Sequence, residues 1–330
     1  MDKPHIGIIG VGMVGTPLKR WFEEFKGYER GKDLFLYDID PKKGYFDDVS
    51  KADVIFIAVP SPRNPDGSCN ISIVEEAVRS IKGEPPASTA GESRPPLAAG
   101  KIIVIKSTVP PGTTERLQKE HHQHKFLFNP EFLTERQAWE DMVRPDRQIV
   151  GFTEKSVDAS HPVLALLPKA PFMSPWGLNT YTPVKITATE AEIIKYGGNV
   201  HFVRKVNFAN ALSFLCGAME RKLHEGGMAG HGVNYENVRK GMSADHRIGD
   251  SHLDVNHGGY KGWGGYCFPK DLDALIAHLA SLGLSGGAEL LNADRAFNEK
   301  ILAEQGLTIE EVSTHDSQLA EKLKQLRNTK

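Results

Sequence analysis

Cysteine is scarce in this chain. Three cysteines occur among 330 residues, at Cys69, Cys216 and Cys267. An odd number of widely separated cysteines builds neither a disulfide framework nor a zinc site. We therefore expect no bound metal and a reducing, cytoplasmic compartment for this protein.

The sequence also lacks an excess of one charge and a long apolar run. The 40 basic and 42 acidic residues give a net charge of −2, and the basic residues are scattered. This balance favours neither a nucleic acid nor a membrane surface as a partner. No apolar stretch approaches the ~20 residues of a membrane span, and the N-terminal apolar segment is too short for a signal peptide. We expect a globular protein that is long enough for two domains.

The first half of the sequence alternates between short, β-rich apolar runs and segments long enough for a helix. Near-continuous apolar strands separated by helices are typical of a parallel sheet covered on both faces. We expect an α/β fold whose first domain, 1–187, is a Rossmann-like doubly wound parallel sheet. The expected strands are 5–9, 33–38, 53–59, 101–105, 125–128 and 147–151. The stretch 83–100, rich in Pro, Gly, Ser and Ala, indicates a surface loop.

From about Thr187 the apolar residues recur with a helical period. Thr189, followed three residues later by Glu192, indicates a capping box. The pattern predicts one helix of more than ~30 residues, which we interpret as a spine that joins domains or subunits. Its expected apolar stripe consists of Ile193, Ile194, Tyr196, Val200, Val203, Val206, Ala209, Leu212 and Cys216.

Shorter helices are expected beyond this spine. A loop at 247–267 is rich in Gly and His and leads into a helix from Pro269 to about Leu282, and a further helix is expected within 288–305. We expect an α-helical central and dimerisation domain at 188–300 and a polar helical tail at 301–330.

A glycine motif follows the first expected strand. Gly10, Gly12 and Gly15 have the G-x-G-x-x-G spacing, in which a tight turn brings a diphosphate to the N-terminus of a helix. Asp38, at the end of the second strand, is placed to accept hydrogen bonds from a ribose 2′-hydroxyl, and its charge repels a 2′-phosphate. The motif therefore predicts NAD rather than NADP. The remaining residues of the expected cofactor loop are Val11, Met13 and Val14.

Five further segments occur in one order along the chain: "AVPSPRNPDGS" (58–68), "KSTVPPGTT" (106–114), "NPEFLTERQAWEDMVRPDRQIVG" (129–151), "EAEIIKYGGN" (190–199) and "GGYCFPKD" (264–271). Together they resemble the UDP-glucose/GDP-mannose dehydrogenase family over roughly residues 5–300. The resemblance implies an NAD-dependent, four-electron oxidation of a nucleotide-sugar C6 alcohol to a carboxylate through a cysteine thioester. We also expect the long helix from about Thr189 to lie in a homodimer interface, because its apolar stripe is wider and longer than one small domain can cover.

The residue types around Cys267 support this chemistry. A thiolate traps an aldehyde as a thiohemiacetal, which loses a hydride to become a thioester that water hydrolyses. Cys267 lies two residues before Pro269, a favoured first position of a helix, and a helix N-terminus lowers the pKa of a thiol. Lys270 adds a nearby positive charge. We interpret Cys216 and Cys69 as core residues.

The other site residues follow mainly from the resemblance. Lys195 and Asn199 are four residues apart, hence on one helix face, and would stabilise an oxyanion beside the cysteine. Asp271 corresponds to an aspartate that activates water or orders the site, and Arg247 to an arginine that reaches the substrate of a neighbouring subunit. The remaining expected contacts are Glu131, Glu135 and Thr108 in catalysis, Lys43, Ser61 and Thr108 at the cofactor, and Glu131, Phe132, Leu133 and Gly264 at the substrate.

The chain departs from the family pattern in several places. The family continues into a second α/β domain, whereas this chain reaches Lys330 after a charged stretch, so we expect the C-terminal nucleotide-sugar domain to be lacking. Ser61 replaces the usual threonine, and Tyr266 replaces the serine before the nucleophile. The loop from Arg247 to Cys267 is about four residues longer than we expect for the family.

Two other functions remain open. A two-electron β-hydroxyacid or 6-phosphogluconate-type dehydrogenase also combines a Rossmann domain, a long helix and a Lys–x₃–Asn pair, but it needs no nucleophilic cysteine. A non-catalytic NAD-binding relative is the other alternative. The yield of NADH per substrate molecule separates the three hypotheses, with two expected for the first, one for the second and none for the third.

Overall fold

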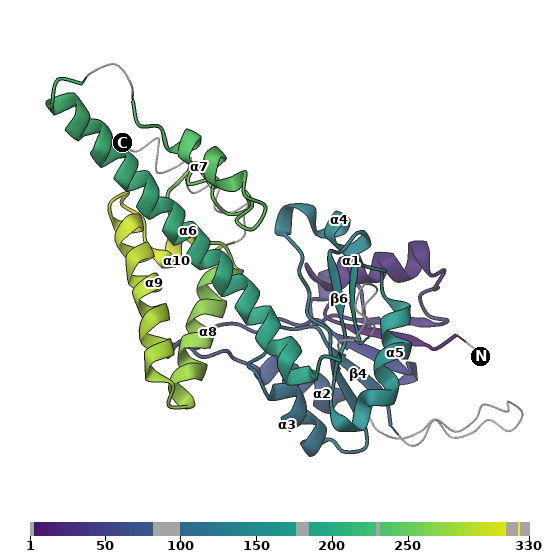
Figure 1. The fold of residues 1–330 in the computed structure, drawn as a ribbon. Coiled ribbons are helices and arrows are strands. Elements are labelled where there is room, and N and C mark those ends of the chain that lie inside the picture. The colour runs from purple at the N-terminus through teal and green to yellow at the C-terminus, as the bar shows by residue number, and fades with distance from the viewer. Residues whose placement is uncertain (1–2, 82–99, 176–184, 229–231, 315–322, 324–330) are drawn as a thin grey trace, which may run out of the picture. The chain divides into compact units, whose positions relative to one another are not determined.

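The computed structural model of the chain describes residues 3–81, 100–175, 185–228, 232–314 and 323 (Figure 1). The chain divides into two compact units, one made of residues 1–64 and 69–195 and the other of residues 65–68 and 196–330. The division falls within one long helix, between Lys195 and Tyr196. Apart from Gly100, the expected surface loop at 83–100 lies outside the described residues.

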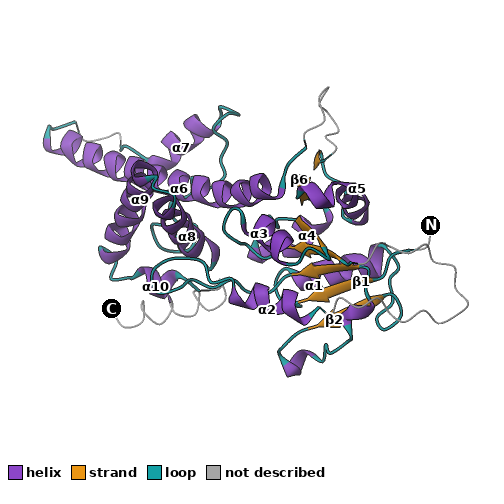
Figure 2. Cartoon of the chain, turned by 90° about the horizontal axis from the view of Figure 1, so that it is seen from below, coloured by secondary structure: helices purple, strands orange, loops and turns teal. Residues whose placement is uncertain are grey.

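Unit 1 contains a six-stranded sheet with the strand order β2-β1-β3-β4-β5-β7, whose strands are drawn in orange in Figure 2. Its strands are β1 (Ile6–Ile9), β2 (Leu34–Tyr37), β3 (Val54–Ile57), β4 (Ile102–Ile105), β5 (Lys125–Phe128) and β7 (Gly151–Phe152). β1 to β5 are parallel, with Ile6 paired to both Leu34 and Val54, and β7 is antiparallel to β5. The predicted Rossmann-like parallel sheet is confirmed.

The last expected strand, 147–151, is divided between two sheets. β6 (Arg147–Ile149) pairs with β8 (Phe172–Ser174), and Gly151 opens β7 in the main sheet. A Cβ on Gly151 would lie 2.7 Å from the Cβ of Ala191 and 2.7 Å from the carbonyl oxygen of Thr187. Glycine is therefore required where β7 passes the start of the long helix, a packing constraint that an apolar run does not reveal.

Helices cover both faces of the main sheet because successive strand side chains point to opposite sides. Ile55 and Ile57 pack in one core cluster with α2 and α3, whereas Val54 and Phe56 pack in another with α1 and α5. The helices are α1 (Gly15–Arg20, continued as a π-helical turn over Trp21–Phe25), α2 (Ser72–Ser80), α3 (Thr113–Glu120), α4 (Ala138–Val143) and α5 (Val157–Leu166). Short 3₁₀ turns occupy Pro41–Lys43, Val49–Lys51, Glu135–Gln137 and Glu154–Ser156.

The described part of unit 2 is built from helices. They are α6 (Ala188–Glu225), which begins in unit 1, α7 (Tyr235–Ser243), α8 (Cys267–Ser281), α9 (Ser285–Ala303) and α10 (Ile309–Val312). α8 and α9 lie side by side and pack against α6, where Val203, Leu272 and Leu291 share one core (Figure 1). The predicted long helix is confirmed, at 38 residues. None of the described helices combines the length and apolar character needed to cross a bilayer.

Two details of α6 differ from the expectation. The capping box is formed by Thr187 and Glu190: the Thr187 N–H donates to the Glu190 carboxylate at 2.7 Å, and the Glu190 N–H donates to the Thr187 hydroxyl at 3.3 Å. The predicted pair, Thr189 and Glu192, has the same spacing, so spacing alone could not choose between them. Ile193, expected on the buried stripe, is 53% exposed.

The chain after residue 300 also differs from the expected polar tail. α9 continues to Ala303, and the buried side chains of Leu302, Leu307 and Val312 join the core of unit 2. These apolar residues are too widely spaced among charged neighbours to give a clear helical pattern, although they are buried.

Candidate functional site

The predicted cofactor residues and Glu131 follow the carboxyl ends of the parallel strands. The glycine loop follows β1, Asp38 follows β2, Ser61 follows β3, Thr108 follows β4 and Glu131 follows β5. In an open parallel sheet these ends share one edge, and ligands bind where the strand order reverses. The order β2-β1-β3 places that reversal at β1.

The glycine loop has the geometry that a diphosphate requires. Gly10 has φ +90°, and a Cβ there would lie 2.5 Å from the carbonyl oxygen of Ala58. A Cβ on Gly15 would collide with the backbone of Gly10, whereas a Cβ on Gly12 would meet nothing within 4 Å. Gly10 and Gly15 are thus needed for packing, and Gly12 faces open space.

Backbone donors at the start of α1 complete this cradle. Among the described residues, the N–H groups of Met13, Val14 and Gly15 have no hydrogen-bond acceptor. N–H groups at the start of a helix bind phosphate oxygens, aided by the helix dipole. The loop therefore fits the diphosphate of a dinucleotide.

Asp38 is a buried carboxylate with three donors. Its Oδ2 accepts from the N–H of Val11 at 2.7 Å and from Nζ of Lys43 at 2.8 Å, and its Oδ1 accepts from the N–H of Asp40 at 3.0 Å. Burial alone would raise the pKa of Asp38, but these donors outweigh it and hold the pKa below its ordinary value. The ionised Oδ1 keeps capacity for one more donor, which fits a ribose hydroxyl. Lys43 therefore forms an ion pair with Asp38, the carboxylate that is predicted to bind the ribose.

A buried ion pair follows β5. Nζ of Lys195 donates to the carboxylate of Glu131 at 2.6 Å and to its carbonyl oxygen at 2.8 Å. The Lys195 ammonium also lies 5.8 Å from the centre of the Phe132 ring, and the N–H of Leu133 donates to Glu131 at 2.8 Å. Burial would raise the pKa of Glu131, but the charge and hydrogen bond of Lys195 outweigh it and lower the pKa.

Lys106 is a third member of this cluster that the sequence analysis did not single out. Its buried Nζ donates to Oδ1 of Asn129 at 2.7 Å. Burial lowers the pKa of Lys106 to about 8, opposed by the negative charge of Glu131. Lys106 could have been identified from the sequence as a lysine directly after an apolar strand, at the sheet edge where the other site residues lie.

In unit 2, Cys267 is the first residue of α8, with Tyr266 in the N-cap position. The helix therefore begins two residues before the expected Pro269. Proline is tolerated there because the first N–H groups of a helix have no intrahelical partner. Cys267 is partly exposed, as a reactive thiol requires, whereas Cys216 and Cys69 are buried.

One turn along α8, Asp271 connects this helix to α6. Its carboxylate accepts from Nδ2 of Asn199 at 2.5 Å and from Nζ of Lys270 at 2.5 Å. Asp271 is 1% exposed, so its carboxyl group faces these two donors and the start of the helix rather than water. Asn199 lies one helical turn after Lys195 on α6.

The other predicted residues differ in their surroundings. The carbonyl oxygens of Ser61 and Thr108 both lie near the Sγ of Cys69, at 3.9 and 3.7 Å, which brings the loops after β3 and β4 together. Glu135 is exposed, unlike Glu131. Arg247 is exposed and forms an ion pair with Asp245 at 2.6 Å.

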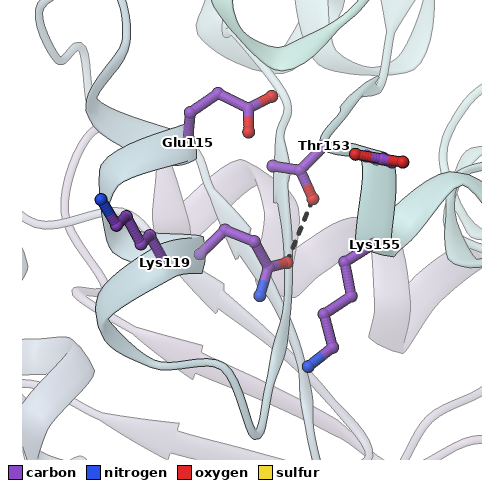
Figure 3. A pocket seen from close by; sticks show the side chains of 6 residues that line it. Glu115, Lys119, Thr153 and Lys155 are labelled. Carbon is purple, nitrogen blue, oxygen red and sulfur yellow. Dashed lines mark hydrogen bonds between the residues drawn. The ribbon is translucent and has the colours of Figure 1, made fainter.

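A hollow of about 350 Å³ lies elsewhere on unit 1 (Figure 3). Glu115 and Lys119 of α3 contribute to its lining, as do Thr153 and Lys155 from the segment before α5, and Glu115 points toward Thr153. Its two lysines and two glutamates balance in charge, and none of its lining residues belongs to the strand ends described above. We assign no role to it.

Comparison with known proteins identifies the family. The UDP-glucose/GDP-mannose dehydrogenase family, NAD binding domain, matches residues 43–164, and the central domain of the same family matches residues 189–300. The chain belongs to this family. The predicted family is confirmed, and so is NAD as the cofactor of the first domain. The match to the NAD binding domain begins after the glycine motif.

Curated relatives carry the same family relationship. A UDP-glucose 6-dehydrogenase of Pseudomonas aeruginosa is 32% identical over 289 residues, which cover 83% of this chain and 55% of the relative. UDP-glucose 6-dehydrogenase AglM of Haloferax volcanii is 29% identical over 320 residues, covering 84% of this chain and 66% of the relative. The chain spans about half the length of the first relatives that it matches.

Solved structures agree on the fold. A UDP-glucose dehydrogenase from Pyrobaculum islandicum superposes with a TM-score of 0.69 at 26% identity, covering 92% of this chain and 71% of the other. A 3-hydroxyisobutyrate dehydrogenase of Mycobacterium tuberculosis superposes with a TM-score of 0.56 at 14% identity, covering 98% and 99%. The second likeness concerns the fold alone, so the choice between a four-electron and a two-electron dehydrogenase depends on the chemistry of the site.

Proposed function

We propose that this protein oxidises the C6 alcohol of a nucleotide sugar to the carboxylate, as in the conversion of UDP-glucose to UDP-glucuronate, through a thioester on Cys267. The observation that carries the proposal is the partly exposed thiol at the N-terminus of α8, one turn from the buried Asp271, which accepts a hydrogen bond from Asn199. A two-electron alcohol dehydrogenase has no use for such a nucleophile.

The reaction removes four electrons and adds one water. The glycine loop and Asp38 would hold NAD, and one NAD would supply the hydride acceptor for each of the two oxidations. The alcohol first loses a proton and a hydride to become an aldehyde. The Cys267 thiolate adds to the aldehyde carbon, a C–S bond forms, and the oxygen takes up the negative charge. Loss of the second hydride gives the thioester, and water breaks the C–S bond to leave the carboxylate and return the thiol.

The charged groups have separate tasks in this scheme. The Lys195 ammonium stabilises the developing oxyanion, and its pairing with Glu131 keeps it oriented in a buried place where its charge is effective. Asn199 donates a hydrogen bond at the same stage. Asp271, fixed by Asn199, orients the hydrolytic water, and Thr108 positions water near the cofactor. We assign substrate contacts to Phe132, Leu133, Gly264 and Glu135.

We also propose that the protein acts as a cytoplasmic homodimer through α6. Phe208, Leu215 and Met219 form an exposed apolar stripe on this helix, with exposed fractions of 56%, 55% and 39%. Burying such a stripe against a second copy is favourable. The exposed Arg247 then serves the neighbouring site. A thiol nucleophile is suited to reducing surroundings, which supports the cytoplasmic assignment.

NADH stoichiometry tests the proposed reaction. The purified protein is supplied with a panel of UDP- and GDP-sugars in limiting amount, with excess NAD, and NADH is followed by absorbance. The proposal expects two NADH per sugar consumed and a uronate product by mass spectrometry. One NADH per molecule of a hydroxyacid substrate would establish the two-electron alternative, and NAD binding without turnover of any substrate would establish the non-catalytic one.

A further inference from the structure

The backbone that leads to Cys267 is held by side-chain amides from the C-terminal part of unit 2. Oδ1 of Asn298 accepts from the N–H of Trp263 at 2.8 Å, and Nδ2 of Asn298 donates to the Trp263 carbonyl at 3.0 Å. Gln305 repeats the arrangement two residues earlier. Its Oε1 accepts from the N–H of Lys261 at 2.8 Å, and its Nε2 donates to the Lys261 carbonyl at 2.9 Å.

A third bond continues the series. The N–H of Gly265 donates to the carbonyl of Val312 in α10 at 2.7 Å. Residues 261, 263 and 265 alternate, as do the residues of a strand that face a neighbouring strand. The exchange of two hydrogen bonds with one residue is the pattern of an antiparallel pair. The two amides and the Val312 carbonyl thus bond every second residue of the segment that leads to the thiol.

The glycines of this segment match that close packing. A Cβ on Gly262 would lie 2.6 Å from Oδ1 of Asn298, and one on Gly264 would lie 2.6 Å from the carbonyl oxygen of Val312. Gly262 also has φ +98°, where a side chain is strained. The segment therefore has little freedom to move away from α9 and α10.

Trp263 connects the same segment to α6. Its indole N–H donates to Oδ1 of Asn207 at 2.9 Å, and Nδ2 of Asn207 donates to the carbonyl of Asp294 in α9 at 2.8 Å. Trp263 is 3% exposed, and Asn298 is fully buried. A buried amide with both ends satisfied fixes its partner strongly, because any other arrangement leaves polar atoms unpaired.

We propose that Asn298 and Gln305 are positioning residues of the Cys267 thiol, which they hold at the start of α8 by clamping the backbone four and six residues before it. The proposal rests on the nucleophilic role proposed above for Cys267. Neither amide is assigned a contact with substrate or cofactor. Gln305 lies outside the part of the chain that the family's central domain matches.

The test measures thiol chemistry without turnover. The full chain and its Asn298→Ala, Gln305→Ala and Asn210→Ala variants are treated with iodoacetamide from pH 5 to pH 10, and alkylation of Cys267 is followed by peptide mass spectrometry. Asn210 is the matched control: it is fully buried in the same unit and donates to the carbonyl of Val206 on its own helix. Native fold is checked by near-ultraviolet circular dichroism.

We expect the midpoint pH of Cys267 alkylation to rise by about half to one unit in Asn298→Ala, because a loosened thiol loses part of the helix N-terminus. The rate at pH 7 then falls about three- to tenfold, since less thiolate is present. Gln305→Ala shifts the midpoint in the same direction. Asn210→Ala lowers the melting temperature and leaves the midpoint unchanged.

The outcomes separate this proposal from the proposed function. An unchanged midpoint in natively folded Asn298→Ala and Gln305→Ala refutes the positioning role, even if wild-type Cys267 is strongly activated. An ordinary thiol midpoint in the wild type refutes thiolate activation and the positioning role together. If Asn298→Ala does not fold, Gln305→Ala decides, because Gln305 is only partly buried and tolerates truncation.

Discussion

Glu192 is the sequence feature whose structural role differs most from the one expected, and it permits a quantitative prediction. Instead of capping α6, its fully buried carboxylate caps α3 from the neighbouring helix. It accepts from the N–H of Gly112 at 2.6 Å, from the N–H of Thr114 at 2.8 Å and from the Thr114 hydroxyl at 2.6 Å. α3 has no side-chain cap of its own. Glu192 thereby fixes the first turn of α6 to the segment after β4.

Replacement of Glu192 should therefore be costly. Glu192→Ala removes the acceptor of two buried donors on Thr114 and of the partly buried Gly112 N–H, and we expect a loss of about 3–5 kcal/mol in the free energy of unfolding. Glu192→Gln keeps an acceptor for Thr114 but places the NH₂ group of the glutamine, a donor, against the Gly112 N–H. We therefore expect the free energy of unfolding to fall by about 1–2 kcal/mol near neutral pH. Glu190→Ala, which removes only the exposed capping box of the same helix, is the control and should cost about 1 kcal/mol.

The pH dependence gives a second, independent measurement. Burial raises the pKa of Glu192 from 4.5 to about 7, opposed by the hydrogen bonds of Thr114 and Gly112. The folded protein thus binds this proton more tightly than the unfolded chain does. The resulting stabilisation is complete below pH 4.5 and is lost as the pH rises to about 7, by an amount on the order of 3 kcal/mol.

Urea denaturation between pH 4.5 and pH 8 measures both effects. We expect the unfolding free energy of the wild type to contain a component that falls over this pH range. We expect this component to be absent from the profile of Glu192→Gln. A wild-type and a Glu192→Gln profile that remain parallel would refute the assigned pKa shift. A Glu192→Ala variant no less stable than Glu190→Ala would refute the role of Glu192 in joining α6 to α3.

Three further predictions concern the proposed function. NAD should support turnover far better than NADP, and Asp38→Ala should reduce the difference between the two rates. Equal initial rates with the two cofactors in the wild type would contradict the predicted role of Asp38. Cys267→Ser should keep the fold and NAD binding but abolish acid production or stop at an ester, whereas Cys216→Ser should cost roughly 1–3 kcal/mol in stability and leave the chemistry intact; acid formation at the wild-type rate by Cys267→Ser would remove the thioester mechanism. Leu215→Lys should convert the dimer to a monomer in light scattering and, by withdrawing Arg247 from the neighbouring site, lower activity; a fully active wild-type monomer at micromolar concentration would exclude both claims.

The fold was predictable where its cause is local. Apolar runs between helical patterns predicted the parallel strands, and a 3.6-residue period of apolar residues predicted α6. Both patterns arise because one defined face of the strand or helix is buried. The strand ends also indicated where most of the predicted cofactor residues lie, since the carboxyl ends of parallel strands share an edge. The start of α8 was predicted two residues late, because Pro269 is equally acceptable inside the first turn.

What the sequence could not reveal depends on tertiary contacts. Glu192 does not cap α6 because its carboxylate binds the start of α3 instead. The segment 147–151 is divided between two sheets where Gly151 packs closely against Ala191. Lys106 gains its place in the site from its distance to Glu131 and Lys195, which no spacing encodes. The clamp on Trp263 likewise joins residues that are 35 positions apart.

The cluster of Lys106, Glu131 and Lys195 contains two buried ammonium groups and one carboxylate. At neutral pH this leaves a formal charge of +1 in surroundings that screen it poorly, and Lys106 responds by releasing its proton near pH 8. An anion that arrives beside these groups reverses that response, because it favours the protonated ammonium. Anion binding near pH 8 is therefore accompanied by proton uptake. Calorimetric titrations in two buffers of different ionisation enthalpy would count that proton directly.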